Sequence, residues 1–133
     1  MHRLISRFFA LFALLAFAGG AFSAGNLPPQ SSSQSGVTVK VTPRSLAGAE
    51  WRFEVVFDTH SGELKDDLLK AAVLVADSGA PSFPTGWQGD GPGGHHRKGV
   101  LRFKPAAASP ASIELRLQRP AEAAPRVFRW QLR

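Results

Sequence analysis

Three of the four histidines are the first candidates for chemistry. His60 lies in the segment DTHSG, and the adjacent His95 and His96 follow a glycine-rich run. Imidazole nitrogens bind zinc and copper well, and a nearby carboxylate could complete such a site. Neighbouring strand residues point to opposite faces, however, so His95 and His96 share a metal only where the backbone bends. We therefore expect His60 and one of His95 or His96 to hydrogen-bond backbone groups, with a zinc or copper site formed by His60, His95 and His96 as the alternative.

Other catalytic patterns are incomplete. The run Gly89–Gly94 matches G-x-G-x-x-G, but a dinucleotide site needs a helix after it, whereas a strand follows here and Pro92 lacks an N–H. Asp58, His60 and Ser61 are too close along an extended chain to align as a catalytic triad. The acidic segment 63–67 lacks the spacing of an EF-hand loop. We therefore predict a protein that is not an enzyme and has no cofactor, apart from the metal of the alternative above.

Five basic residues fall on the outward parity of the last three predicted strands or directly after them. If those strands are neighbours in one sheet, they present a basic face that could hold an anionic envelope glycan, a lipid headgroup or an acidic protein. The alternative is that outward Lys and Arg keep exposed strand edges from pairing with other chains. Nucleic acid is not expected, because the tryptophans have the pattern of core residues rather than of a stacking surface. The five residues are Arg102, Lys104, Arg116, Arg129 and Arg133.

The first 24 residues have the pattern of a secretory signal peptide. A basic start is followed by an apolar run over Phe8–Phe17 and then by small residues, which predicts cleavage after Ala24 or Ala21. A single membrane anchor is the alternative, although the apolar stretch is shorter than the roughly 20 residues that span a bilayer. The chain has no cysteine, so we expect neither a lipid attachment nor a disulfide. We therefore expect an exported protein in the periplasm or outside the cell, with no transmembrane segment after cleavage.

The rest of the chain divides into a linker and one domain. Residues 25–36 are rich in Ser, Pro and Gln, which predicts a flexible linker before a domain over residues 37–133. In that domain, apolar and polar residues alternate with the period of a strand in several segments. The segment 63–70 predicts a helical turn before a strand, with one helix over 64–76 as the alternative. The predicted strands are 37–41, 51–58, 71–76, 99–104, 112–118 and 127–132.

Short strands separated by Gly and Pro turns predict an all-β fold, a single immunoglobulin-like β-sandwich of six to seven strands. The apolar parity of each strand identifies the expected core. We also expect the loops Asp58–Leu64 and Trp87–Arg97 to lie against each other at one end, with Trp87 covering the glycine turn. The expected core residues are Trp51, Phe53, Val55, Phe57, Leu74, Leu101, Phe103, Ile113, Leu115, Leu117, Phe128 and Trp130.

Four segments, FDTHSGEL, WQG, GGHHRKGVLRF and RVFRW, resemble those of a family of small uncharacterised secreted bacterial proteins and lipoproteins. The resemblance extends over about Val37 to Leu132. It implies that His60 and either His95 or His96 belong to one local arrangement at the same end of the sandwich. No activity is carried over from the family, and the amino-terminal Cys of its lipoprotein members is missing here.

These patterns together favour one class of function. We expect a non-enzymatic, monomeric binding or accessory module whose partner is an envelope protein, a glycan or a lipid headgroup. The alternative is an envelope protein that binds zinc or copper through the three histidines.

Overall fold

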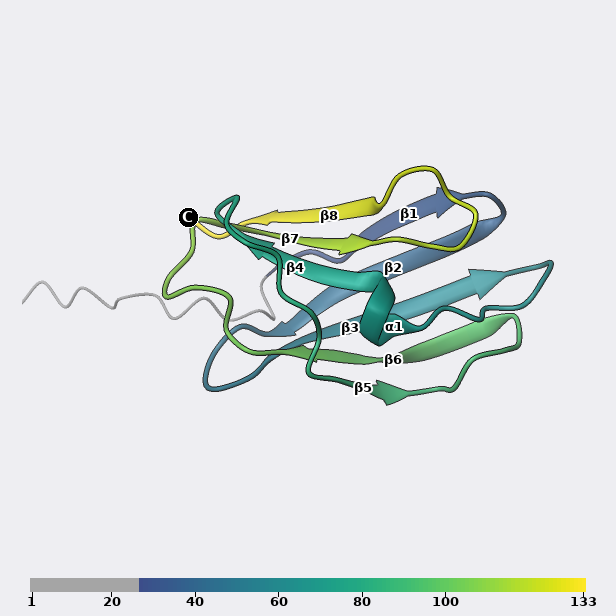
Figure 1. Cartoon of the computed structure of the whole chain (residues 1–133), viewed down its shortest axis with the longest axis horizontal. Helices are drawn as coiled ribbons and strands as arrows, with labels where there is room; N and C mark the ends of the chain where they lie inside the picture. The colour runs from purple at the N-terminus through teal and green to yellow at the C-terminus, as the bar shows by residue number, and fades with distance from the viewer. Residues whose placement is uncertain (1–26) are drawn as a thin grey trace, which may run out of the picture.

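Two antiparallel sheets pack face to face in a computed structural model that describes residues 27–133 (Figure 1). The five-stranded sheet has the order β1-β2-β3-β6-β5, and the three-stranded sheet has the order β4-β7-β8. The predicted all-β, immunoglobulin-like sandwich is confirmed, with eight strands instead of six or seven. The elements are β1 (Gln30–Gln34), β2 (Val37–Ser45), β3 (Trp51–Thr59), α1 (Leu68–Ala71), β4 (Ala72–Ala76), β5 (Gly86–Gly89), β6 (His96–Phe103), β7 (Ser112–Leu117) and β8 (Arg126–Gln131).

The core follows the alternation of the strands. All twelve residues predicted to be buried are buried, because each occupies the inward position of its strand. Phe53 is at the centre, with its ring edge-on to Phe103 at 5.7 Å and 5.9 Å from the ring of Trp130 on the opposite sheet. Leu64 and Leu68 add to this core from the segment before β4. The two sheets are therefore held together by one continuous apolar layer.

The helical turn predicted before β4 is confirmed. Residues Leu68–Ala71 form a single helical turn, and Asp67 caps it by accepting a hydrogen bond from the backbone N–H of Leu69 at 3.2 Å. Ala72–Ala76 then pairs with β7 as a strand. The alternative of one helix over residues 64–76 is wrong, because the backbone of Ala72–Ala76 pairs with β7 at the edge of the three-stranded sheet and has to be extended.

The predicted linker is wrong over Gln30–Gln34. These residues form β1, which pairs with β2 in a hairpin closed by Ser35 and Gly36 at φ values of 52° and 74°. Two successive residues with positive φ are typical of the two-residue turn that matches the twist of a hairpin. Polar composition concealed this strand, because its ladder depends on backbone hydrogen bonds and its side chains need no apolar face.

The start of the described chain is tied to β8 as well. The side-chain amide of Gln30 donates to the carbonyl of Arg129 and accepts from the N–H of Arg129. The indole N–H of Trp130 donates to the carbonyl of Pro28 at 2.8 Å. Polar side chains therefore link β1, at the edge of one sheet, to β8, at the edge of the other.

A second strand, β5, was not predicted. Gly86–Gly89 pairs with β6 in a region where a Cβ on Gly89 would lie 2.3 Å from the Cα of Gly99. Trp87 fills the space above Gly99, which therefore also has to be glycine. The glycines that pointed to a loop instead permit two strands and an indole ring to approach closely.

The predicted signal peptide over residues 1–24 and the first two residues of the predicted linker lie outside the described residues. Within residues 27–133, no helix is long and apolar enough to cross a membrane.

Replacing Phe53 with Ala should lower the free energy of unfolding by about 3 to 5 kcal/mol, because the cavity would lie between the two sheets. Chemical denaturation measures this loss. The control is Phe83→Ala, whose ring is 62% exposed and whose loss should change stability by less than about 0.5 kcal/mol. Equal effects of the two substitutions would contradict the assigned core.

Candidate functional site

Several connections between strands lie together at one end of the sandwich, to the right in Figure 1. Residues 60–67, 90–95 and 118–125 lie there with the hairpin turn at 35–36, and we call this end the loop pole. The loops are held by hydrogen bonds to one another as well as by their strands. The loop pole is the first place to look for a functional site, because loops on a rigid sandwich commonly carry function.

The predicted contact between the two histidine-bearing loops is confirmed. The backbone N–H of Thr59 donates to the carbonyl of His95 at 2.9 Å. Leu64 and the glycine run are joined in both directions, with Leu64 N–H to Gly94 O at 3.0 Å and Gly93 N–H to Leu64 O at 2.8 Å. Gly93 and Gly94 have positive φ values of 117° and 74°, which a side chain would strain. The DTHS and GGHH segments therefore form one local arrangement.

The three histidines of this arrangement do not act together. His96 Nδ1 lies 2.6 Å from Asp58 Oδ1, which connects the end of β3 to the start of β6 through side chains and not through the backbone bond that we expected. His60 and His95 are exposed beside this pair. Within residues 27–133, no group of three or more His, Cys, Asp or Glu is arranged to hold a metal. The geometry gives the zinc or copper alternative no support.

Arg97 anchors the glycine loop from inside. Its side chain is buried, donates from Nε to the carbonyl of Asp90 at 3.0 Å and from Nη1 to the carbonyl of Asp66 at 2.5 Å, and lies over the ring of Trp87. Burial lowers the pKa of Arg97, and the nearby carboxylates of Asp66, Asp90 and Asp67 partly offset this effect. Trp87 also donates its indole N–H to the carbonyl of Asp90 at 2.9 Å. As predicted, Trp87 packs against the glycine turn.

A chain of buried ion pairs continues from Asp66 to β8 of the three-stranded sheet. Arg119 donates two hydrogen bonds of 3.0 Å to the two carboxylate oxygens of Asp66. Glu122 accepts two further bonds from Arg126, at 2.9 and 2.8 Å, and lies 3.5 Å from Arg119. The side chains of all four residues are at most 9% exposed. Each buried charge therefore has at least one opposite partner, as burial in a medium of low dielectric requires.

Arg126 extends this chain to the β1–β2 hairpin. Its guanidinium donates to the carbonyls of Ser32 and Val37 at 2.9 Å each and to the carbonyl of Gln34 at 2.8 Å. Hydrogen bonds from Arg126 also lower the pKa of Glu122, with smaller contributions from its charge and from Arg119. One side chain on β8 therefore fixes the turn between β1 and β2.

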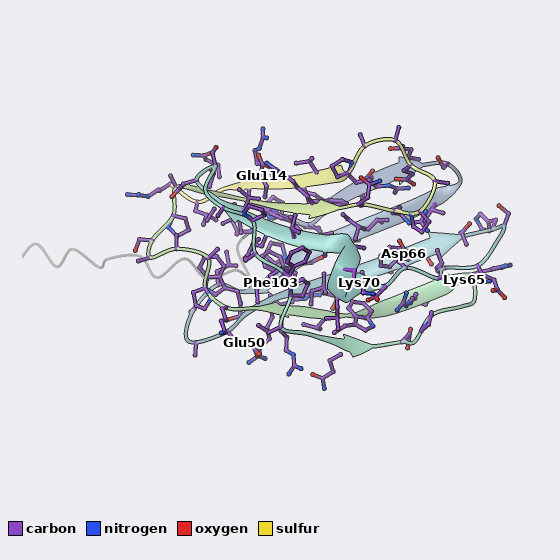
Figure 2. The ribbon with its side chains drawn as sticks, in the orientation of Figure 1. Glu50, Lys65, Asp66, Lys70, Phe103 and Glu114 are labelled. Carbon is purple, nitrogen blue, oxygen red and sulfur yellow. The ribbon has the colours of Figure 1, made fainter. Side chains whose placement is uncertain are left out.

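A shallow pocket of about 290 Å³ opens beside this chain. Asp66 and Arg119 contribute to its wall but are already engaged with each other. Lys70 and Asp67 are the exposed charges on its lining. Figure 2 shows Lys70 and Asp66 close to the single helical turn. The complete lining is Asp66, Asp67, Lys70, Ala71, Gln118, Arg119 and Pro120.

The predicted basic face is wrong because its strands belong to different sheets. Arg102 lies on β6 and Lys104 directly after it, in the five-stranded sheet, whereas Arg116 and Arg129 lie on β7 and β8 of the other sheet. Their outward side chains therefore project from opposite faces of the sandwich. Arg133, after β8, is exposed.

Arg116 and Arg129 are also both paired with one carboxylate. Arg116 donates to Glu114 at 2.9 and 3.0 Å, and Arg129 donates to the other carboxylate oxygen of Glu114 at 2.6 Å. The hydrogen bonds from Arg116 and then Arg129 hold the pKa of Glu114 below its ordinary value. This cluster is therefore an ion-paired surface and not an open cationic site.

The buried ion-pair chain was not identified from the sequence, although a signal for it exists. Arg97, Arg119 and Arg126 each occupy the buried parity of a strand or its direct extension, where the other residues of the same parity are apolar or glycine. Asp66 likewise lies between the buried Leu64 and Leu68. A charge on an apolar parity predicts a buried partner, because an unpaired buried charge is very costly.

Comparison with protein-family models, with curated proteins and with solved structures found no match to this chain. The site therefore has to be interpreted from its own geometry.

Glu122→Gln should destabilise the protein by about 3 to 5 kcal/mol at pH 7, because Arg126 would lose its charged partner in a buried position. The folded-state pKa of Glu122 is lowered from an ordinary value of 4.5, so its contribution is complete above pH 4.5 and is lost as the pH falls through the folded pKa. The difference between the parent protein and the variant should therefore shrink below pH 4.5. Chemical denaturation between pH 7 and about pH 3 measures this change.

The control is Glu63→Gln, which removes an exposed carboxylate paired with Lys65 at 3.3 Å. It should cost less than about 1 kcal/mol at any pH. A Glu122→Gln deficit that is the same at every pH would contradict a charge-dependent role for this residue.

Proposed function

We propose that this protein is an exported, non-enzymatic binding or accessory module that acts as a monomer and contacts an envelope partner through the loop pole. One observation carries this proposal. The chain Asp66, Arg119, Glu122 and Arg126 fixes the loops of the pole from within, so that the exposed side chains on them sit on a rigid frame. Preorganised surface groups lower the entropy cost of association.

The groups on the two sides of this frame have different roles. The buried charges are paired with each other and cannot exchange protons with a substrate without breaking the pole. The outer surface carries His60, His95 and Lys65, all exposed and borne on loops that backbone hydrogen bonds hold in place. Such a surface is suited to recognition by hydrogen bonds and charge, which favours binding over catalysis.

Export is supported by the order of residue types over residues 1–24 and by the way the domain is stabilised. The chain contains no cysteine, so its stability does not depend on the redox state of the compartment. The sandwich relies instead on an apolar layer and on buried ion pairs, both of which form equally well outside the cytoplasm.

The metal-binding alternative, with His60, His95 and His96 as ligands, has no comparable observation in its favour. His96 is engaged with Asp58 across the β3–β6 pair. A shared metal would require this pair to open and the imidazoles of His60 and His95 to move toward it.

Export predicts that the mature protein lacks the leader. Intact-mass analysis of the protein recovered from an envelope or culture-supernatant fraction should give a chain beginning after Ala21 or Ala24, because small residues at these positions suit signal peptidase. A full-length chain found in a membrane fraction would contradict cleavage.

A partner at the loop pole can be detected by site-specific photocrosslinking in intact cells. A photoreactive residue in place of His60 or His95 should give a discrete crosslinked species, because both side chains are exposed on the pole. The matched control places the same group at Lys104, which is exposed at the opposite end of β6. Equal crosslinking at both ends, or none at the pole, would contradict a partner at this surface.

Glu122→Gln distinguishes recognition by a rigid pole from chance contact. Its substitution leaves every exposed pole residue in place but removes the charge that holds Arg126. The crosslinked species should weaken in this variant at a temperature where the domain is still folded, whereas crosslinking that persists at full strength would contradict the need for a rigid pole.

A further inference from the structure

A second charged cluster lies on the outer face of the five-stranded sheet, away from the loop pole. Glu50, Arg52, Gln88, Val100 and Arg102 line a pocket of about 280 Å³, which we call the sheet-face pocket. Figure 2 shows Glu50 and Glu114 on opposite sides of the sandwich, with Phe103 between them. The sheet-face pocket is therefore separate from the paired Glu114 cluster.

The sheet-face pocket holds two arginines directly opposite each other. Arg52 on β3 is in register with Arg102 on β6, and like charges in this position repel. Glu50 is the carboxylate between them, and its oxygens lie 3.5 Å from Arg52 Nε and 3.8 Å from Arg102 Nε. These separations permit an ion pair but are too long for good hydrogen bonds. Two cations therefore share one loosely placed anion.

Arg102 also has an unsatisfied donor. Its Nε is buried and has no hydrogen-bond partner among the described residues, although much of the rest of the side chain is exposed. A buried N–H without a partner is costly, and native structures seldom leave one without a reason. An acceptor oxygen entering the sheet-face pocket would remove this cost.

The neighbouring strand holds Arg102 in position. Its guanidinium lies against β5 at Gly86, where a Cβ would be 2.6 Å from Arg102 Nη2 and 3.0 Å from Nε. Gly86 therefore gives the guanidinium room to lie flat against the sheet. The side-chain amide of Gln88, two residues further along β5, lines the same pocket and adds a donor.

A cluster of the same residue types on the opposite face of the sandwich has complete hydrogen bonds. There, Arg116 and Arg129 also share a single carboxylate, Glu114, but all three hydrogen bonds are 3.0 Å or shorter. Glu114 is also only 15% exposed, against 39% for Glu50. The same residue types are therefore satisfied on one face and unsatisfied on the other.

Further cations extend the positive charge along the same sheet face. Lys40 and Lys98 are outward residues on either side of Val56 in the strand register, and neither forms an ion pair with a residue of the described chain. Lys98 is four residues from Arg102 on β6, or roughly 13 Å along the strand. A ligand that meets both positions must carry more than one negative group along an extended chain.

The uncharged residues around these cations indicate which class of polyanion fits the outer face of the five-stranded sheet. The large exposed apolar side chains of the described chain are Leu69, Phe83 and Val127, and none of them is on β2, β3, β5 or β6, although Phe83 comes three residues before β5. A membrane surface or a protein partner is usually anchored by such side chains. The outward neighbours of Lys40 on β2 are the hydroxyl residues Thr38 and Thr42. The outward carboxylates of β3, Glu54 and Asp58, are already engaged with Arg44 and His96. Hydroxyl and guanidinium donors suit a hydroxyl-rich polymer with acidic groups.

We propose that the sheet-face pocket binds the carboxylate or sulfate groups of an anionic polysaccharide, with Arg102 and Arg52 contacting one acidic group and Lys98 or Lys40 the next. This inference goes beyond the partner proposed for the loop pole, and its test uses no pole residue. Contact with several spaced charges lets weak single contacts add up to useful affinity.

The test is a titration of the purified full mature chain with dextran sulfate oligomers at low ionic strength, followed by calorimetry and by the NMR signals of Arg102 Nε and the Gln88 side-chain amide. Arg102→Gln and Arg52→Gln should each weaken binding about tenfold, since a charge-assisted contact is lost. Arg129→Gln is the matched control, because it removes the same charge from the opposite face, and its effect should be less than about twofold. Uncharged dextran should not bind.

Gly86→Ala separates a built site from general attraction to positive charge. The variant keeps every charge, but its Cβ displaces the Arg102 guanidinium, so binding should weaken about fivefold or more. Thermal unfolding of each variant verifies that the domain is folded at the temperature of the titration. Equal affinity of the parent protein and Gly86→Ala would overturn the proposed geometry.

Three other probes identify the alternatives. Saturable binding of inorganic phosphate with no gain from dextran sulfate would overturn a polymer site in favour of a small-anion site. Stronger binding to phosphatidylglycerol vesicles or to polyglutamate than to dextran sulfate, lost in Arg102→Gln, would overturn the polysaccharide in favour of a membrane or an acidic protein. A loss of dextran sulfate binding in Arg129→Gln as large as in Arg102→Gln would show charge attraction alone and would also overturn the proposal.

Discussion

The buried chain of Asp66, Arg119, Glu122 and Arg126 is the interaction on which the arrangement of the loops depends. It runs from the segment before α1, through the β7–β8 connection, to the hairpin that joins β1 and β2. Buried ion pairs seldom add net stability over apolar side chains of the same size, but they penalise every arrangement that separates the charges. The apolar layer therefore provides most of the stability, while the ion pairs select one arrangement of the pole.

The pairing of opposite charges also distinguishes two clusters on the surface, one whose hydrogen bonds are complete and one that leaves a donor without a partner. Where an acidic residue is half-enclosed between two arginines, as at Glu114, its pKa falls and the charges are satisfied locally. Where the carboxylate is set back, as at Glu50, it forms only long ion pairs with two arginines, and Arg102 Nε stays buried without a hydrogen-bond partner among the described residues. The loop pole and the sheet-face pocket, the two surfaces for which we propose partners, therefore differ in how their charges are satisfied.

Many features of the fold could be predicted from periodicity alone. Phe53, Leu115 and Trp130 were placed in the core because each lies on the apolar parity of its strand, and all three are buried. The strand over Ala72–Ala76 was predicted from its β-branched residues and the turn that follows it. Alternation is a local property, because successive side chains of a strand must point to opposite faces whatever the strand pairs with.

Partners along the sheets and across the pole were decided by tertiary structure. β1 and β5 carry no apolar alternation. The first is an edge strand held by polar contacts, and the second is a short glycine-rich strand whose Trp87 covers Gly99 on β6. The predicted basic face failed because parity gives the direction of a side chain but not the sheet to which its strand belongs. Asp66 and Arg119 are 53 residues apart, and no local pattern pairs them. The sequence by itself determined which apolar residues of the predicted strands are buried, because their burial follows from local alternation. Only the tertiary structure decided which charges meet, because contacts between distant segments depend on how the whole chain packs.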